Sequence, residues 1–259
     1  MKPRIIAVAN QKGGVGKTTT VINLGATLAA YEKTTALVDL DPQSNCTSGL
    51  GIDAITDNQV STYPVLMGLA EFDAGLLSSA FPHLCVLPST PDLAGAEVEL
   101  VGMVGREFRL RDALADVQGF EYVLIDCPPA LGHLTVNALT AAHGLIVPIQ
   151  CEYFALEGVS ELMKTVDDVR RFLNPALSID GVLLTMYDER TNLSRQVADE
   201  VRGVFGDLVF ESVVPRNVRL AEAPSFGRPI HAYDLRSRGA QAYLHLGREY
   251  LSRMRSFNA

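Results

Sequence analysis

The sequence of 259 residues contains no tryptophan and few cysteines. Its four cysteines, Cys46, Cys85, Cys127 and Cys151, lie far apart and form no Cys-x-x-Cys pair. This spacing argues against a disulfide framework and a paired-cysteine iron–sulfur site, and it indicates reduced, mostly buried thiols. No apolar run approaches the roughly 18 residues of a membrane span, and the N-terminus lacks a signal-peptide pattern. We therefore expect a globular cytoplasmic protein.

Lysine is also missing from position 190 to the C-terminus, where arginine is frequent. The formal net charge of the chain is −8, which argues against blanket affinity for nucleic acid. The charge is uneven, however, because arginines outnumber acidic residues in this last part of the chain. A guanidinium group pairs with two phosphate oxygens at once, so such a segment suits phosphate contacts. Scattered, solvated arginines are the alternative interpretation.

A glycine-rich loop near the N-terminus departs from the ordinary phosphate-binding pattern. Residues 12–19 read KGGVGKTT, so Gln11 stands where Gly-x-x-x-x-Gly-Lys-Ser/Thr requires its first glycine. An apolar strand is expected at 4–9 before the loop and a helix at 17–30 after it. The loop then presents backbone N–H groups, and the helix N-terminus adds partial positive charge. This arrangement predicts a nucleotide site.

Each residue type in the loop has a physical role there. Gly13, Gly14 and Gly16 allow the backbone to approach a phosphate without a clash from Cβ. Lys17 is expected to reach the β- and γ-phosphates of ATP, and the Thr18 hydroxyl to hold Mg²⁺.

Lys12 is the unusual residue of this loop. Two lysines five positions apart on one tight loop cannot easily serve one phosphate from the same side. Lys12 can instead reach the nucleotide of a partner subunit, as a cation acting in trans on charge at the γ-phosphate. A surface lysine that only raises the local potential is the alternative.

Carboxylates close two of the expected strands. Asp126 ends the apolar run 122–126 and is expected to hold Mg²⁺ directly or through water. No glutamate follows it, so Asp41 is the better candidate to position the attacking water, with Asp39 supporting the Mg²⁺ shell. A site that positions the attacking water without a strong general base predicts slow ATP turnover. The alternatives are a strand-capping role for Asp126 and a turn-initiating role for Asp39 and Asp41.

Strand and helix patterns alternate along the whole chain. Strands are expected at 4–9, 35–41, 84–88, 122–126, 145–149, 179–186 and 208–210. Helices are expected at 17–30, 65–69, 74–80, 92–100, 105–118, 155–172, 193–205 and 238–254. Residues 42–51 and 215–229 are expected to be irregular, and 52–82 are the least readable part.

This alternation predicts an α/β protein with one doubly wound, mainly parallel sheet and helices on both faces, forming a single domain over 1–259. Ligands of such sheets bind beyond the carboxyl ends of the strands, so the loop and the carboxylates should converge on one site.

Beyond the loop, further motifs make the pattern more specific. They are VDLDPQ (38–43), IDCPP (125–129), PIQCEYFALEG (148–158), GVLLTM (181–186), VPRNVRLAEAPSFGRPI (214–230) and RSRGAQAY (236–243). With KGGVGKTT, they resemble the ParA/Soj family of chromosome-partitioning ATPases, which carry a deviant Walker A motif. The match runs nearly end to end and is closest to the Soj type, which lacks the extra N-terminal DNA-binding domain of some plasmid relatives.

The resemblance implies a role for each matching residue. Lys12 is the signature lysine of an ATP-sandwich homodimer, and Asp41 the residue needed for hydrolysis. The nucleotide-binding positions are Gly13, Gly14, Val15, Gly16, Lys17, Thr18, Thr19, Pro215 and Asn217. Arg190 and Arg219 match arginines that contact double-stranded DNA without sequence preference. A ParB-type partner is expected to stimulate hydrolysis, and the protein to associate with the nucleoid.

The nearest rival is a MinD-like cell-division ATPase, which uses the same loop but docks on a membrane. That function needs a basic amphipathic C-terminal helix. Here five apolar residues recur at helical spacing near the C-terminus, a pattern more typical of core packing: Tyr243, Leu244, Tyr250, Leu251 and Met254. A metabolic enzyme that transfers the γ-phosphate to a small molecule is a second rival, and an ATP-gated DNA-binding scaffold a third.

Overall fold

The computed structural model describes residues 2–52, 59–153 and 155–257. Its strands form one sheet of seven in the order β3-β4-β2-β5-β1-β6-β7. All neighbouring strands are parallel except β3 and β4. The strands are β1 (Arg4–Val8), β2 (Thr35–Asp39), β3 (Leu77–Ser78), β4 (Leu84–Leu87), β5 (Tyr122–Asp126), β6 (Gly144–Gln150) and β7 (Ser178–Thr185). The predicted doubly wound, mainly parallel sheet is confirmed.

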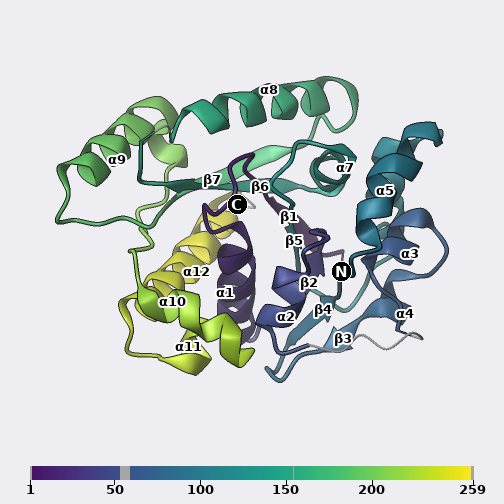
Figure 1. The fold of residues 1–259 in the computed structure, drawn as a ribbon, viewed down its shortest axis with the longest axis horizontal. Coiled ribbons are helices and arrows are strands. Elements are labelled where there is room, and N and C mark those ends of the chain that lie inside the picture. Colours follow the sequence, from purple (N-terminus) through teal and green to yellow (C-terminus); the bar gives the residue numbers. More distant parts are fainter. Residues whose placement is uncertain (1, 53–58, 154, 258–259) are drawn as a thin grey trace.

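Helices cover both faces of this sheet (Figure 1). One face carries α3 (Thr62–Met67), α5 (Leu93–Glu99), α6 (Arg109–Ala113), α7 (His133–Ala141), α8 (Glu157–Phe172) and α9 (Asn192–Phe205). The other carries α1 (Lys17–Ala30), α2 (Asn45–Gly49), α11 (Ile230–Tyr233) and α12 (Arg238–Phe257). Shorter elements are α4 (Phe72–Gly75), α10 (Val218–Glu222), η1 (Leu100–Gly102), η2 (Arg106–Phe108), η3 (Gly206–Leu208) and η4 (Ala223–Phe226).

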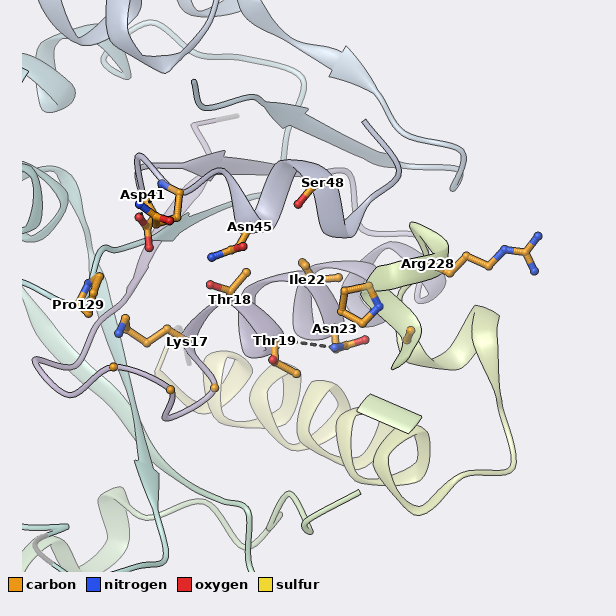
Figure 2. Close-up of a pocket in the computed structure, with 16 residues that line it drawn as sticks. Lys17, Thr18, Thr19, Ile22, Asn23, Asp41, Asn45, Ser48, Pro129 and Arg228 are labelled. Atoms are coloured by element: carbon orange, nitrogen blue, oxygen red, sulfur yellow. Dashed lines mark hydrogen bonds between the residues drawn. The ribbon is translucent and has the colours of Figure 1, made fainter. Parts of the chain in front are cut away.

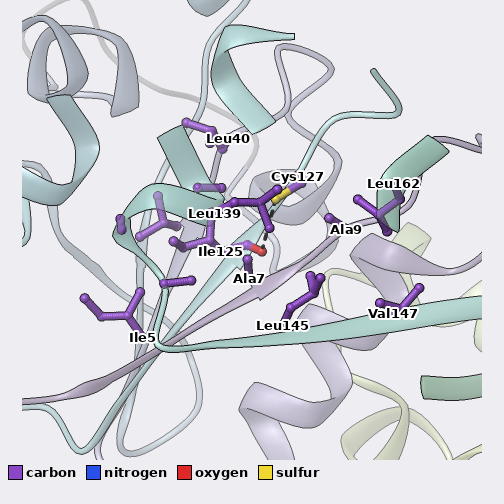
Figure 3. Close-up of a cluster of buried hydrophobic side chains, with 14 of the residues drawn as sticks. Ile5, Ala7, Ala9, Leu40, Ile125, Cys127, Leu139, Leu145, Val147 and Leu162 are labelled. Atoms are coloured by element: carbon purple, nitrogen blue, oxygen red, sulfur yellow. Dashed lines mark hydrogen bonds between the residues drawn. The ribbon is translucent and has the colours of Figure 1, made fainter. Parts of the chain in front are cut away.

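Two hydrophobic cores follow from this layering, because alternate residues of each strand point to opposite faces. Ala7 of β1 and Ile125 of β5 belong to the core under α7 and α8, together with Leu162 (Figure 3). Ile6 and Leu124 point the other way and pack under α1 and α12. Central strands buried on both faces explain why the sequence shows unbroken apolar runs there.

The C-terminal helix α12 packs into the second core. Tyr243, Tyr250 and Met254 are buried, so the apolar stripe near the C-terminus serves core packing, as predicted. The Tyr243 hydroxyl lies 3.2 Å from the Thr20 hydroxyl on α1.

Farther along α12, Tyr250 donates a 2.7 Å hydrogen bond to Asp180 of β7. Arg4 of β1 forms an ion pair with the same carboxylate. This buried network fixes α12 to the end of the sheet opposite the glycine-rich loop.

Several local predictions were wrong. Residues 42–51 contain α2, and 215–229 contain α10 and η4, because short helices in loops leave little periodicity to read. Residues 74–80 form the end of α4 and the edge strand β3, not a helix, and α7 was not predicted.

The strand expected at 208–210 is the end of η3 followed by a single bridge from Val209 to Val182. Within the least readable segment, residues 53–58 lie outside the described residues.

The buried network on α12 gives a stability prediction. Tyr250→Phe should lower the free energy of unfolding by about 1–3 kcal/mol, because it leaves a buried Asp180 oxygen without this donor. Chemical denaturation monitored by circular dichroism measures the change. Tyr63→Phe is the matched control, since the Tyr63 hydroxyl bonds Glu99 at an exposed site and should contribute little. An equal loss in both variants would contradict the assignment.

Candidate functional site

The glycine-rich loop runs between β1 and α1, at the carboxyl edge of the sheet. Gly14 and Gly16 have φ values of 73° and 90°, in the left-handed region that favours glycine. Val15 is buried, and its carbonyl accepts a 2.8 Å hydrogen bond from the Thr185 hydroxyl at the end of β7. Gly13 and Gly14 are exposed to solvent, and α1 begins at Lys17, directly after the loop.

A cavity of about 440 Å³ lies against this loop. Its walls come from the loop, α1, the β2–α2 connection, α2, the segment after β5, and η4 with the residues that follow it (Figure 2). The lining residues are Gly13, Gly14, Gly16, Lys17, Thr18, Thr19, Ile22, Asn23, Asp41, Gln43, Asn45, Ser48, Pro129, Ala223, Pro224 and Arg228. The predicted convergence of the loop and Asp41 on one site is therefore present. The cavity has the size of a small-ligand site.

Lys17 is buried at the base of this cavity, and its ammonium group donates a 3.2 Å hydrogen bond to the Lys12 carbonyl. Burial lowers the pKa of Lys17, while the negative charge of Asp126, and less strongly that of Asp41, opposes this effect. The cation is held close to two carboxylates and faces the space above the loop.

Asp39 and Asp126 lie directly opposite each other at the ends of β2 and β5. Both are fully buried. Burial, and then the nearby charge of Asp39, raise the pKa of Asp126 well above its usual value. No well-formed hydrogen bond to either carboxylate oxygen of Asp126 comes from the part of the chain that the structure describes, but the Thr18 hydroxyl lies close enough to oppose the rise in the pKa of Asp126. A buried carboxylate without a donor is costly unless a ligand or ion satisfies it.

Asp39 differs from Asp126 because its oxygens are engaged by the chain itself. One oxygen accepts hydrogen bonds from the Thr47 backbone at 2.8 Å and the Thr47 hydroxyl at 2.6 Å. The other accepts the Asp41 backbone N–H at 3.2 Å. Burial raises the pKa of Asp39 to about 6, and the Thr47 hydrogen bonds oppose the shift.

The residues at this edge fit a magnesium ion bound with a nucleotide. Among residues 2–52, 59–153 and 155–257, no group of three or more His, Cys, Asp or Glu side chains could hold a metal alone. Magnesium in nucleotide sites needs few protein ligands, since phosphates and water supply the rest. The unsatisfied Asp126 carboxylate and the Thr18 hydroxyl provide such a partial ligand set.

Lys12 lies outside the set of cavity-lining residues, although it begins the loop. Its backbone N–H donates a 3.0 Å hydrogen bond to the Asn10 side chain, whose amide group in turn donates to the Pro148 carbonyl at 2.7 Å. The half-buried Lys12 ammonium forms no hydrogen bond or ion pair with the described residues. Its backbone is therefore fixed, and among the described residues its charge has no partner.

Comparison with known proteins identifies the family. A family model described as an AAA domain matches residues 3–179. The chain is 54% identical over 259 residues to the chromosome partitioning protein ParA of Caulobacter vibrioides, covering 99% of this chain and 97% of that protein. It is 54% identical over 247 residues to the sporulation initiation inhibitor protein Soj of Bacillus subtilis, covering 95% and 97%. The chain belongs to the ParA/Soj family.

Solved structures agree on the ParA/Soj fold. Cobyrinic acid a,c-diamide synthase from Mycobacterium smegmatis, with bound ADP and magnesium, has a TM-score of 0.85 at 42% identity, covering 98% of this chain and 96% of that one. The septum site-determining protein MinD of Pyrococcus horikoshii, complexed with Mg-ADP, has a TM-score of 0.77 at 24% identity, covering 95% of each chain. The second likeness shows the fold alone.

Besides Lys12, three residues that the ParA/Soj resemblance assigns to the nucleotide, Val15, Pro215 and Asn217, do not line the cavity. Pro215 bridges to Tyr187, just beyond the β7 end that supports the loop through Thr185. The Asn217 side chain accepts the Arg219 backbone N–H at 2.8 Å and caps α10. Their contact with the base remains a prediction.

The predicted DNA-contacting residues of this ParA/Soj protein, Arg190 and Arg219, lie on neighbouring exposed segments. The bridge from Tyr187 to Pro215 joins these two segments. Arg190 forms two hydrogen bonds, of 2.9 and 2.7 Å, with Asp188, whose pKa it lowers well below the usual value. Arg219 pairs with Glu222 at 2.8 Å. Exposed ion pairs are weak, so phosphates can displace these carboxylates.

Sequence reasoning missed several residues of the site. Asn23 lines the cavity, and its side chain links the Thr19 carbonyl at 2.8 Å to the Ile230 backbone N–H at 2.7 Å. The Asn10 side chain accepts a hydrogen bond from the loop at Lys12, and the Thr47 hydroxyl donates one to Asp39. A signal was available for Asn23, which lies four residues after Thr19 and so on the same helix face. Thr47 gave no signal, because its partners are set by the unpredicted α2.

The buried carboxylate pair predicts a gain in stability on mutation. Without nucleotide and in EDTA, Asp126→Asn should raise the melting temperature at pH 8 by at least about 2 °C, the shift that ~1 kcal/mol gives for a chain of this size. The folded pKa is raised, so ionisation above the unfolded pKa penalises the native state, and the asparagine removes this penalty. Near pH 4 the gain should vanish, because the unfolded state is also protonating.

Differential scanning calorimetry at both pH values measures this effect. The control is Asp112→Asn, whose carboxylate is exposed beside Arg111. Destabilisation by Asp126→Asn at pH 8 would show that the carboxylate has a compensating partner in the free protein.

Proposed function

We propose that this protein is a chromosome-partitioning ATPase whose ATP-bound homodimer binds double-stranded DNA. The observation that carries the proposal is Lys12, whose backbone is fixed beside the cavity-lining Gly13 and whose ammonium group has no partner among the described residues. A lysine in this position can complete the site of a second subunit across a shared nucleotide interface. Membership of the ParA/Soj family supports the same reading.

Each residue around the cavity has a separate proposed role in ATP hydrolysis. Bound magnesium would neutralise phosphate charge, held by Thr18 and Asp126. Lys17 and the loop backbone orient the β- and γ-phosphates. Asp41 lies at the cavity wall with one oxygen bound to the Gln43 backbone N–H at 2.9 Å, and it positions the attacking water. Asp39 supports the magnesium shell from behind. No glutamate follows Asp126, so turnover is slow until a ParB-type partner raises it.

DNA binding is proposed to depend on dimerisation. The acidic net charge of −8 disfavours binding by one subunit with a modest arginine patch. Two patches side by side, each including Arg190 and Arg219, bind a phosphate backbone with the avidity of linked sites. ATP then controls DNA affinity by controlling assembly, and the ATP-bound protein would associate with the nucleoid.

One experiment tests this link directly. DNA binding is measured by fluorescence anisotropy with ADP or a non-hydrolysable ATP analogue, while light scattering gives the oligomeric state of the same samples. The proposal expects dimers and DNA binding only with the analogue, and a steep loss of binding between about 50 and 200 mM salt. Equal DNA binding by monomers with ADP would refute it.

A MinD-like membrane function is the alternative. No helix among the described residues is both long and apolar enough to cross a bilayer. The apolar side chains of α12 that a membrane anchor would need are instead buried, as Tyr243 and Tyr250 show. Co-sedimentation with anionic liposomes at physiological salt separates the two functions, and ATP-dependent pelleting without DNA would favour the alternative.

Lys12 yields a prediction that separates binding from assembly. Lys12→Ala should leave the nucleotide affinity of the monomer within about threefold, because Lys12 does not line the cavity. It should weaken ATP-dependent dimerisation or turnover at least about tenfold, equivalent to ~1.4 kcal/mol. Fluorescent-nucleotide titration and analytical ultracentrifugation measure the two effects. Lys33→Ala, at a surface ion pair with Glu121, is the control. Loss of nucleotide binding by the Lys12→Ala monomer would mean that Lys12 contacts the nucleotide of its own subunit.

The arginine face yields a charge-reversal prediction. Arg219→Glu should lower DNA affinity at least about tenfold at 100 mM salt, since it replaces a phosphate contact by repulsion. ATP binding should be unchanged. Arg111→Glu carries the same change of charge at an exposed position on α6, which contacts α3 and α7, and is the control for net charge. Equal losses in both variants would mean that overall charge, not this face, governs binding.

A further inference from the structure

Thr47 on α2 connects the ends of two strands behind the nucleotide cavity. Its backbone N–H and its hydroxyl both contact one oxygen of Asp39, at 2.8 and 2.6 Å. The same hydroxyl accepts the Ser89 backbone N–H at 3.0 Å, just beyond β4. Thr47, Asp39 and Ser89 are all buried, so water does not compete for these bonds.

The direction of each hydrogen bond is fixed by chemistry. The Ser89 N–H can only donate, so the Thr47 oxygen must accept there. Its single hydroxyl proton is then directed to the Asp39 carboxylate. The bond is charge-assisted and short, which makes it one of the stronger kinds in proteins.

The chain of contacts continues to the cavity. The second oxygen of Asp39 accepts the Asp41 backbone N–H at 3.2 Å, and an Asp41 oxygen accepts the Gln43 backbone N–H at 2.9 Å. The Asp41 backbone is therefore held by Asp39, and the Asp41 carboxylate is held by the Gln43 backbone N–H. Asp39 also lies opposite the buried Asp126 at the end of the neighbouring strand, and the donors from Thr47 and Asp41 hold it in this position.

We propose that Thr47 is a positioning residue for ATP hydrolysis, which acts through Asp39 to hold Asp41 at the cavity wall. The inference rests on the proposed role of Asp41 in turnover. Thr47 does not line the cavity at the phosphate loop and does not touch the nucleotide space. Its loss should therefore affect the hydrolytic step more than nucleotide binding, because small displacements of a positioning group reduce rates strongly.

The test compares three substitutions of Thr47 in the full-length protein. Thr47→Val keeps the shape and removes the hydroxyl, Thr47→Ser keeps the hydroxyl, and Thr47→Cys supplies a weaker donor. Turnover is measured at saturating Mg-ATP, and nucleotide affinity by titration with a fluorescent ATP analogue. Melting temperatures are recorded alongside.

The proposal expects Thr47→Val to lower kcat at least tenfold while nucleotide affinity changes less than threefold. Thr47→Ser should restore most of the rate, and Thr47→Cys should be intermediate. If Thr47→Val fails to fold, the Ser and Cys variants still give the ranking. A parallel fall of affinity, melting temperature and kcat would indicate a purely structural role and would overturn the proposal, as would an unchanged kcat.

Asp41→Ala separates this inference from the function on which it rests. If Asp41→Ala hydrolyses ATP normally, the proposed role of Asp41 fails, and the Thr47 inference with it. If Asp41→Ala is inactive and Thr47→Val is normal, only the Thr47 inference fails. When both are slow, adding Thr47→Val to Asp41→Ala should cause no further loss, because the two residues act as one unit.

Discussion

The site depends on two carboxylates that parallel pairing forces together at one edge of the sheet. Asp39 and Asp126 end adjacent strands in register, both without exposure to solvent. A fold that maximised its own stability would not place two acids there. The chain satisfies one of them through Thr47 and leaves the other without a well-formed hydrogen bond from the described residues. This asymmetry leaves Asp126 available for an ion that arrives with the nucleotide.

The glycine-rich loop carries a comparable asymmetry between its lysines. Lys17 is buried at the cavity and bonded within the loop, whereas Lys12 has a fixed backbone and a charge with no partner among residues 2–52, 59–153 and 155–257. Around them, the central strands are buried on both faces, and α12 is fixed by Arg4, Asp180 and Tyr250. The Asp126 carboxylate and the Lys12 ammonium lie near the same edge, where a nucleotide and a second subunit would supply partners.

Much of this could be predicted from the sequence. The central strands were predictable because burial on both faces leaves unbroken apolar runs, and the carboxyl-edge rule then placed Lys17, Thr18 and Asp41 together. The α2 helix and the edge strand β3 are too short to show a period, so they were missed. Asn23 and Thr47 were missed because their partners are distant in sequence. The roles of Pro215 and Asn217 came only from resemblance, and neither residue lines the cavity.

Complementation between two impaired variants tests most directly whether Lys12 acts on the nucleotide of its partner. Lys12→Ala and Asp41→Ala proteins are mixed, and ATP turnover is compared with that of each alone. If Lys12 acts in trans, a mixed dimer contains one site with its own Asp41 and the lysine of the Asp41→Ala subunit. The mixture should then regain a substantial part of the activity, up to about half per mixed dimer. Activity no higher than the sum of the separate variants, with mixed dimers present, would contradict the account.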